Sequence, residues 1–159
     1  MFDLHRDEVL FPDGRRASFE VIRHGGAVAI LPQEANGDFL FVRQYRHAVQ
    51  SMLLEIPAGR LESGENPLEC AQREIREEIG MAAAQWQDMG SFLWAPGYSN
   101  EVISLFFAYD LSPESLPQDD DEEIEIVRIS PADALEQLQR GQITDAKTAL
   151  ALMLYTNNQ

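Results

Sequence analysis

The stretch GRLESGENPLECAQREIREEIG, Gly59–Gly80, combines the signals of one helix with a concentration of negative charge. Pro67 is tolerated in the first turn of a helix, and Gly80 suits a C-terminal cap. Between them, apolar residues at three- and four-residue spacing form one stripe: Leu68, Ala71, Ile75 and Ile79. The sequence therefore predicts an amphipathic helix that ends near Gly80.

A second face of this helix carries Glu74, Glu77 and Glu78, at positions i, i+3 and i+4, where side chains converge. Two like charges about 5 Å apart repel by roughly 3 kcal/mol at an effective dielectric near 20. Carboxylate clusters of this kind suit magnesium or manganese, which take oxygen ligands. The alternative is an ordinary solvated helix face, on which Arg73 and Arg76 relieve the repulsion.

The charge of the whole chain disfavours two classes of large partner. Its 159 residues include 27 acidic and 12 basic side chains, which gives a formal charge of −15. A field of that sign repels nucleic-acid backbones and anionic membranes, so we expect neither as a partner. It also repels a small phosphorylated substrate unless a divalent cation is recruited locally.

Length and composition predict one soluble globular domain, because hydrophobic residues make up 45% of the chain. The single cysteine, Cys70, excludes an intrachain disulfide, and the start MFDLHRDEVL lacks the apolar stretch of a signal peptide. The longest apolar runs, such as residues 149–155, are too short to cross a bilayer. We therefore expect a cytoplasmic protein.

Strand patterns dominate the rest of the sequence. We expect strands at residues 17–23, 26–31, 39–44, 52–56, 86–93, 102–109 and 124–129. Two helices should follow, one from Ser130-Pro131 to near Gly141 and one from about Thr144 to Tyr155. This order predicts an α+β fold with a mixed sheet flanked by helices.

The N-terminal residues 1–22 look like an appendage to a main domain of residues 23–159. A turn at Pro12-Asp13-Gly14 predicts a hairpin of two strands. Because a two-stranded hairpin is marginal alone, packing against a second subunit would stabilise it, and we expect a homodimer.

The quoted stretch resembles the Nudix box. That pattern is Gly, five residues, Glu, seven residues, Arg-Glu, an aliphatic residue, any residue, Glu-Glu, any residue, Gly and an aliphatic residue. Its specified positions are filled here by Gly59, Glu65, Arg73, Glu74, Ile75, Glu77, Glu78, Gly80 and Met81. The resemblance implies a Nudix-like α/β/α sandwich and an enzyme that uses Mg²⁺ or Mn²⁺ to hydrolyse a nucleoside diphosphate linked to another group.

The resemblance also implies roles for particular residues. Arg73 would orient neighbouring groups in catalysis and Glu77 would serve both catalysis and the metal. Glu65 would likewise be an orienting residue, and an interaction with the helix dipole is its alternative. The implied metal ligands are Glu74, Glu77, Glu78 and the backbone carbonyl of Ala58.

Three further segments, residues 42–46, 54–59 and 95–101, resemble the ADP-ribose pyrophosphatase branch of that family. Pro96 stands sixteen residues after Gly80, as in that branch. The resemblance implies cleavage of ADP-ribose to AMP and ribose 5-phosphate. Enzymes acting on other nucleoside diphosphate sugars share several of these features, and they form the nearest alternative.

Four residues in these segments are candidates for binding the substrate. Arg46 could meet a phosphate through its planar guanidinium, or form an ordinary surface ion pair. Glu101 could bind ribose hydroxyls or help to hold metal, or be an exposed residue at the start of a strand. Pro96 and Gly97 could shape a loop at the pocket edge, where backbone approaches the substrate closely.

The acidic run QDDDEE, residues 118–123, is either a solvated loop or the source of the general base. In the resembling hydrolases a loop before a late strand supplies a glutamate that assists the attacking water. Glu122 is the first candidate here and Asp120 the second. A glutamate is usual near Asp120, and the shorter aspartate leaves the choice between them open.

Two readings from other classes stay open. One is a Nudix-like domain that senses ADP-ribose without hydrolysing it, against which the complete set of box glutamates argues. The other is an acidic dimeric interaction protein without catalytic activity.

Overall fold

The computed structural model describes residues 3–117 and 123–157 of the chain. Its strands are β1 (Asp3–Leu10), β2 (Arg16–Arg23), β3 (Ala27–Pro32), β4 (Phe39–Arg46), β5 (Ser51–Glu55), β6 (Ala58–Arg60), β7 (Met81–Leu93), β8 (Val102–Pro113) and β9 (Ile124–Ile129). Its helices are α1 (Pro67–Glu78), α2 (Pro131–Gln139) and α3 (Ala146–Asn157).

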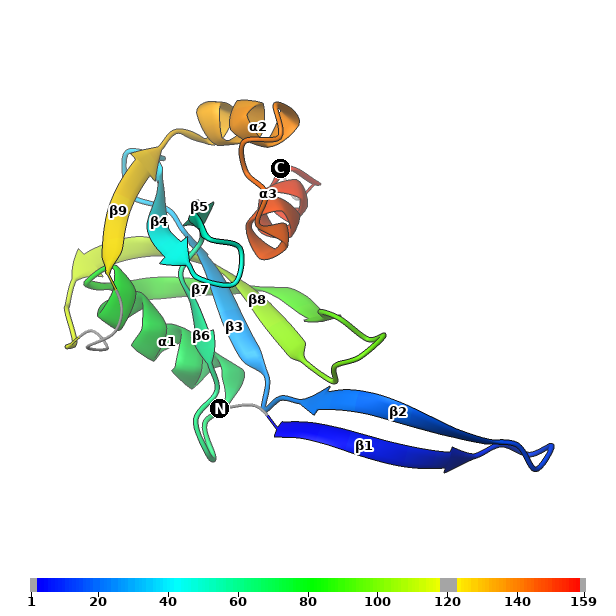
Figure 1. Cartoon of the computed structure of the whole chain (residues 1–159). Coiled ribbons are helices and arrows are strands. Elements are labelled where there is room, and N and C mark those ends of the chain that lie inside the picture. Colours follow the sequence, from blue (N-terminus) through cyan, green and yellow to red (C-terminus); the bar gives the residue numbers. More distant parts are fainter. Residues whose placement is uncertain (1–2, 118–122, 158–159) are drawn as a thin grey trace.

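The strands form a central mixed sheet, a smaller antiparallel sheet and a separate hairpin (Figure 1). The central sheet has the order β6-β3-β8-β7, and the smaller one the order β5-β4-β9. In the central sheet β3 and β8 are parallel, whereas the other neighbours are antiparallel. A parallel pair needs a crossover between its strands, and here that crossover contains the acidic helix α1.

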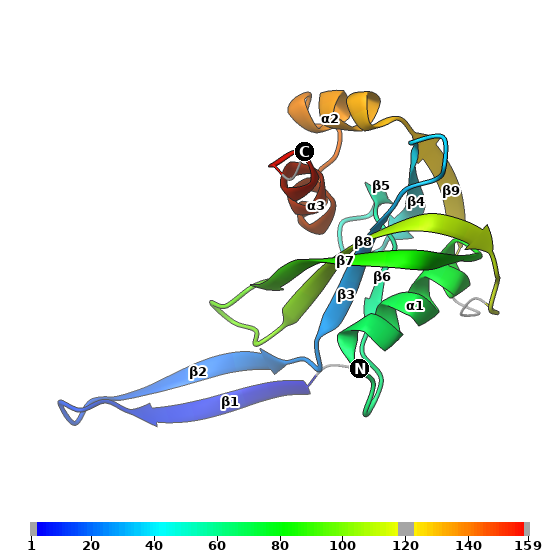
Figure 2. The same cartoon turned by 180° about the vertical axis from the view of Figure 1, so that it is seen from behind.

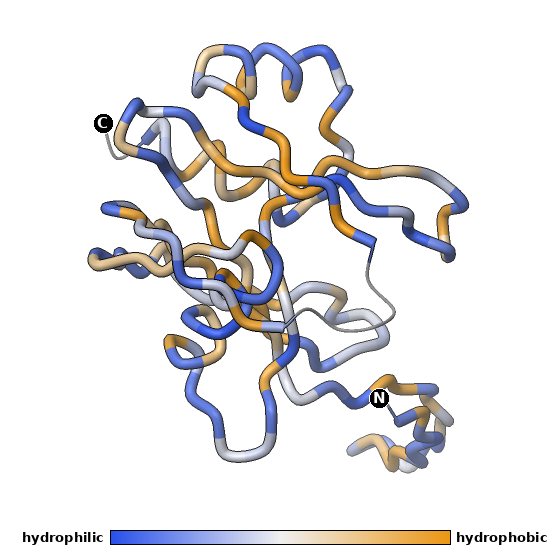
Figure 3. Tube along the Cα trace, turned by 90° about the vertical axis from the view of Figure 1, so that its left-hand side faces the viewer, coloured by the Kyte–Doolittle hydropathy of each residue, from blue (hydrophilic) through white to orange (hydrophobic). Residues whose placement is uncertain are grey.

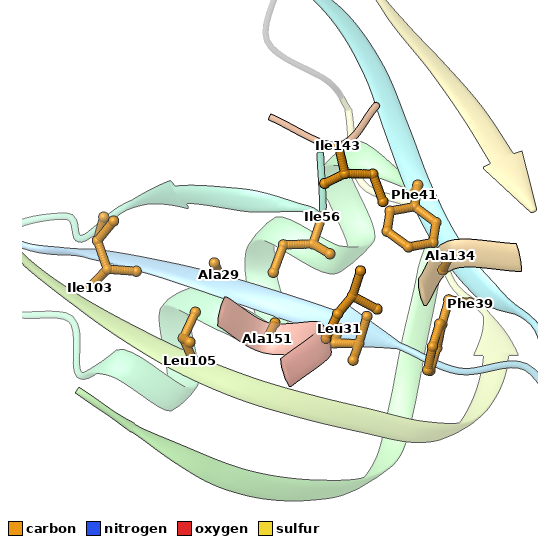
Figure 4. Packing of buried hydrophobic residues seen from close by; sticks show 12 residues of the cluster. Ala29, Leu31, Phe39, Phe41, Ile56, Ile103, Leu105, Ala134, Ile143 and Ala151 are labelled. Carbon is orange, nitrogen blue, oxygen red and sulfur yellow. The ribbon is translucent and has the colours of Figure 1, made fainter. Parts of the chain in front are cut away.

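Strand β3 lies at the centre of the fold because both of its faces are buried. Ala29 and Leu31 point into a core that includes residues of α3 (Figure 4), whereas Val28 and Ile30 point into a second core that contains residues of α1. Successive side chains of a strand face opposite ways, so one strand anchors both layers. Helices α1 and α3 thus cover opposite faces of the central sheet. The predicted α+β sandwich with a mixed sheet is confirmed.

Helix α1 begins with a capping box. The side chain of Asn66 accepts hydrogen bonds from the backbone N–H groups of Leu68 and Glu69, and the Glu69 carboxylate accepts one from the N–H of Asn66. The predicted apolar stripe is wrong at Leu68, which is 38% exposed. The thiol-bearing Cys70 is fully buried, because the core lies on its side of the first turn.

Some element boundaries differ from the prediction. Strand β7 begins at Met81 rather than at residue 86, because Gly80 adopts a φ of +67° and turns the chain directly into the strand. Its alanine-rich start lacks the β-branched residues typical of strands. Strand β6 was not predicted, since three residues are too few to show a periodic pattern.

The predicted N-terminal hairpin is confirmed. Strands β1 and β2 pair from Asp3 opposite Arg23 to Leu10 opposite Arg16, and the turn contains Gly14 with a φ of +87°. The hairpin projects from the sandwich in both views (Figures 1 and 2), and in Figure 3, where it is seen nearly end-on, it contains both hydrophilic and hydrophobic residues. At its base the backbone N–H of Ile22 donates to the carbonyl of Tyr98 at 2.7 Å.

In the described parts of the chain, no helix combines the length and the apolar character needed to span a membrane.

Candidate active site

The acidic helix α1 meets the backbone of β6 at Gly59, and this contact requires glycine. A Cβ added at position 59 would lie 1.9 Å from the carboxylate carbon of Glu74, far inside van der Waals contact. Glu74 is itself nearly buried, with 9% of its surface exposed. The missing side chain of Gly59 therefore makes the space in which the Glu74 carboxylate lies against the main chain.

Arg73 connects three of the glutamates. Its Nε and Nη2 donate to the two carboxylate oxygens of Glu65, both at 3.0 Å, which is the bidentate geometry of a strong pair. Its Nη1 donates to Glu74 at 2.6 Å and to Glu77 at 2.8 Å. Nη2 also donates to the carbonyl of Arg60 at 3.1 Å, which ties the helix to the end of β6.

This arrangement shifts the pKa values of its members. Hydrogen bonds from Arg73 are the main reason why the pKa of Glu65 falls to about 2, although partial burial opposes the change. The hydrogen bond with Glu65 in turn raises the pKa of Arg73 above its ordinary value. Burial raises the pKa of the Cys70 thiol, so this side chain is a neutral packing group.

Glu78 lies deeper than the other glutamates of α1, with 3% of its surface exposed. The backbone N–H of Ala58 donates to its Oε2 at 3.1 Å. Ala58 and Gly59 thus contact two different glutamates of the same helix, Glu78 and Glu74, through consecutive residues of β6.

A cavity of 760 Å³ opens beside this helix. Glu74, Glu77 and Arg73 line it from α1, and Ala58 and Gly59 from β6. Other parts of the chain contribute further wall residues, among them His24, Arg46, Trp94, Glu101, Asp145 and Lys147. The fold therefore brings the acidic box together with two basic side chains from distant segments.

Those two basic side chains, Arg46 and Lys147, share one buried carboxylate. Glu55 is 2% exposed and accepts hydrogen bonds from Nε and Nη2 of Arg46 at 2.8 and 2.9 Å, and one from Nζ of Lys147. Burial alone would raise the pKa of Glu55, but the hydrogen bonds and positive charges of Arg46 and Lys147 outweigh it and lower the pKa. Arg46 does form an ion pair, as its predicted alternative role requires. The prediction of an ordinary surface pair is wrong, however, because the partner, Glu55, is buried.

Lys147, Glu55 and His24 were not predicted as site residues. Lys147 is the only lysine in the sequence, and this rarity could have marked it as a candidate site residue. It is 92 residues from Glu55 in sequence, however, and only the fold brings the two side chains into contact. Nδ1 of His24 accepts a hydrogen bond from the N–H of Gly26 at 3.1 Å and lies 3.6 Å from Oε1 of Glu101. Nothing in the sequence pattern links these two residues.

Other predicted site residues lie apart from the cavity or beyond the described parts. Pro96 and Gly97 belong to the turn between β7 and β8 and are not among the residues that line the cavity. A Cβ at Gly97 would meet no atom within 4 Å, so no close approach requires glycine there. Glu122 and Asp120 lie outside the described residues.

The donor set suits a hard divalent cation. Glu74, Glu77 and Glu78 offer carboxylate oxygens, and Gly59 leaves room for one of them beside the main chain. Within residues 3–117 and 123–157 no group of three His, Cys, Asp or Glu side chains converges as a preformed metal site. Arg73 holds the carboxylates of Glu74 and Glu77, so metal binding would have to rearrange these contacts.

Comparison with known proteins gives consistent matches. The model of the NUDIX domain family matches residues 23–152. An ADP-ribose pyrophosphatase of Bacillus subtilis strain 168 is 36% identical, with 96% of this chain and 83% of that protein covered. A GDP-mannose pyrophosphatase of Yersinia enterocolitica serotype O:8 is 30% identical, with 95% and 86% covered.

A solved structure extends these matches to the fold. The crystal structure of an ADP compounds hydrolase is 26% identical and superposes with a TM-score of 0.86. The match covers 99% of this chain and 85% of the other.

Exchange of Gly59 for alanine tests the contact between β6 and α1. In Gly59→Ala the new Cβ should push the Glu74 carboxylate away and break its 2.6 Å contact with Arg73, while the fold persists because only a side-chain end has to move. A crystal structure of the variant checks this. Gly97→Ala is the matched control and should leave its surroundings unchanged. An undisturbed Glu74 in Gly59→Ala would contradict the described packing.

Proposed function

The chain belongs to the NUDIX family, and from this premise we propose that it hydrolyses the pyrophosphate of ADP-ribose with a divalent cation, giving AMP and ribose 5-phosphate. The observation that carries the proposal is the set of three glutamates on α1 beside Ala58 and Gly59. Glu74 and Glu77 line a cavity large enough for a nucleotide, and Glu78 lies behind them against the N–H of Ala58. The ADP-ribose pyrophosphatase and the ADP compounds hydrolase to which the chain is similar support the substrate class.

Glu74, Glu77 and Glu78, with the carbonyl of Ala58, are the groups that would hold the cation. A magnesium or manganese ion bound there supplies charge neutralisation and polarisation of the phosphoryl group. We take Mg²⁺ as the physiological ion, because carboxylates, carbonyls and water are its preferred ligands, and Mn²⁺ as a substitute.

The remaining side chains bind and orient. In the proposal Arg46 receives a phosphate oxygen, since a guanidinium held in a fixed plane suits phosphate better than a flexible ammonium does. Arg73 keeps the carboxylates of Glu65, Glu74 and Glu77 in a fixed relation, which limits their repulsion before substrate arrives. Glu101 lies at the cavity wall, where it can accept hydrogen bonds from ribose hydroxyls. For Pro96 and Gly97, which do not line the cavity, we propose only that they shape the loop before Glu101.

The proton of the attacking water needs a carboxylate base, for which Glu122 and Asp120 remain the proposed residues. A carboxylate at hydrogen-bond distance from the water suffices as a general base.

Two other functions compete with this one. Hydrolysis of a different nucleoside diphosphate sugar is favoured by the similarity to a GDP-mannose pyrophosphatase. Binding of ADP-ribose without hydrolysis is the second, and the complete set of acidic side chains on α1 speaks against it.

A comparison of substrates tests the proposal. We expect the purified protein to hydrolyse ADP-ribose with a much higher kcat/KM than UDP-glucose, GDP-mannose or ATP, and a chelator should abolish turnover. Chromatography of the products checks both. Preference for GDP-mannose would replace the substrate but keep the chemistry. Binding of ADP-ribose without products would favour the sensor.

The metal assignment is tested by Glu78→Gln. This variant keeps the shape of the buried side chain but removes its charge, so turnover should fall by at least about 100-fold while circular dichroism shows an intact fold. Glu136→Gln, on the exposed surface of α2, is the control and should behave like the unaltered protein. Unchanged turnover in Glu78→Gln would reject Glu78 as a metal ligand.

The homodimer is part of the proposal, and the hairpin is its proposed interface. Leu4 and Leu10 share one face of β1 and are 71% and 63% exposed. In sedimentation experiments we expect a mass of twice 17.9 kDa, and a shift toward the monomer in Leu4→Asp/Leu10→Asp. Met153→Asp, on the exposed side of α3, should not change the mass. A monomer in the unaltered protein would reject the dimer.

A further inference from the structure

Lys147 is the only lysine among the 12 basic residues of the chain, and it lies in an unusual place. It is the second residue of α3, far in sequence from the acidic box, yet it lines the same cavity. Only 9% of its surface is exposed. A buried ammonium needs partners of opposite charge, so the carboxylates that it contacts indicate its role.

The ammonium contacts two carboxylates, those of Glu55 and Asp145. Nζ of Lys147 donates to Oε2 of Glu55 and lies 3.0 Å from Oδ1 of Asp145. Glu55 also accepts the bidentate pair from Arg46, whose side chain is 38% exposed and lines the cavity. A carboxylate that is 2% exposed thus joins an inner cation to an outer one.

The main chain fixes Lys147 relative to Glu55. The carboxylate of Asp145 caps the start of α3, since its Oδ2 accepts from the N–H of Thr148 at 3.0 Å and from Oγ1 of Thr148 at 2.5 Å. The N–H of Ile56 donates to that same Oγ1 at 2.9 Å. Because Ile56 follows Glu55 directly, the helix start and the end of β5 are held as one unit.

The charges explain why a second cation is useful at this place. Arg46 and Lys147 balance Glu55 and Asp145, so these four side chains are neutral together. Without Lys147 the group would carry one net negative charge at the wall of a cavity meant for a pyrophosphate. Of these four side chains, only Arg46 would then remain to pair with Glu55. The negative charge of Glu55 would cancel the guanidinium charge and weaken its attraction for a phosphate.

We infer that Lys147 is a positioning residue for pyrophosphate binding: it neutralises and fixes Glu55, and Glu55 in turn holds the guanidinium of Arg46 at the cavity wall. The inference rests on the proposed function for its substrate. It assigns to α3, the last helix, a part in a site whose proposed metal-binding carboxylates come from α1.

Kinetics of Lys147→Met test this role. We expect the KM for ADP-ribose to rise about tenfold while kcat stays within about twofold, because binding is weakened equally in the ground and transition states. Lys147→Arg should recover most of the lost affinity, since it keeps the charge. Arg128→Met removes an exposed ion pair with Glu34 elsewhere and should leave both constants unchanged. A KM within twofold of the unaltered value in folded Lys147→Met would overturn the inference.

A double-mutant cycle separates positioning from direct contact with the substrate. If Lys147 acts through Glu55, Glu55→Gln/Lys147→Met should have the same KM as Glu55→Gln alone. If the two effects multiply, Lys147 contacts the substrate itself and the inference is wrong. The double variant removes both buried charges together, so it keeps the test valid where Lys147→Met alone does not fold. A KM equal to that of the unaltered protein in the double variant would also overturn the inference.

The dissociation constant of ADP with magnesium, measured by calorimetry, distinguishes failure of the inference from failure of the proposed function. If the unaltered protein does not hydrolyse ADP-ribose, the proposed function fails, and the same variants are then compared by ADP affinity. About tenfold weaker ADP binding in Lys147→Met would support the positioning role. Equal affinity would overturn it.

Discussion

The guanidinium of Arg73 offsets the repulsion that Glu65, Glu74 and Glu77 would otherwise create along the catalytic helix α1 and the loop before it. It binds Glu65 through two hydrogen bonds and reaches Glu74 and Glu77 through a third nitrogen. Isolated carboxylates this close would favour protonation or displacement of the helix. With Arg73 among them, the charges can stay on side chains that are mostly buried.

That arrangement depends in turn on where the main chain passes. Gly59 makes room for the Glu74 carboxylate, and the N–H of Ala58 binds Glu78. Strand β6 is held beside β3, and β3 is buried on both faces by packing against α1 and α3. The acidic face of α1 is therefore positioned by the same strand that organises both hydrophobic cores.

The basic side chains of the cavity, Arg46 and Lys147, are held by the buried carboxylate of Glu55. This arrangement is the acidic box with the signs of the charges reversed. Here one buried carboxylate serves two cations, Arg46 and Lys147, whereas at the box one cation serves three carboxylates. Because the buried charges described on both sides of the cavity have partners of opposite sign, ion pairing offsets the free-energy cost of removing them from water. A chain with a net charge of −15 can in this way offer basic groups where a pyrophosphate would lie.

The sequence by itself determined the helix of the acidic box, the N-terminal hairpin and the α+β class, because these follow from local spacing, turn residues and capping groups. It predicted Glu74, Glu77 and Arg73 as neighbours, since residues three and four apart meet on one helix face. It placed Leu68 wrongly and missed β6, whose burial and pairing depend on partners elsewhere. Only the tertiary structure joined Lys147 to Glu55 and His24 to Glu101, and put Pro96 outside the cavity wall. Contacts between distant segments arise from the packing of whole elements, and no local period in the chain encodes them.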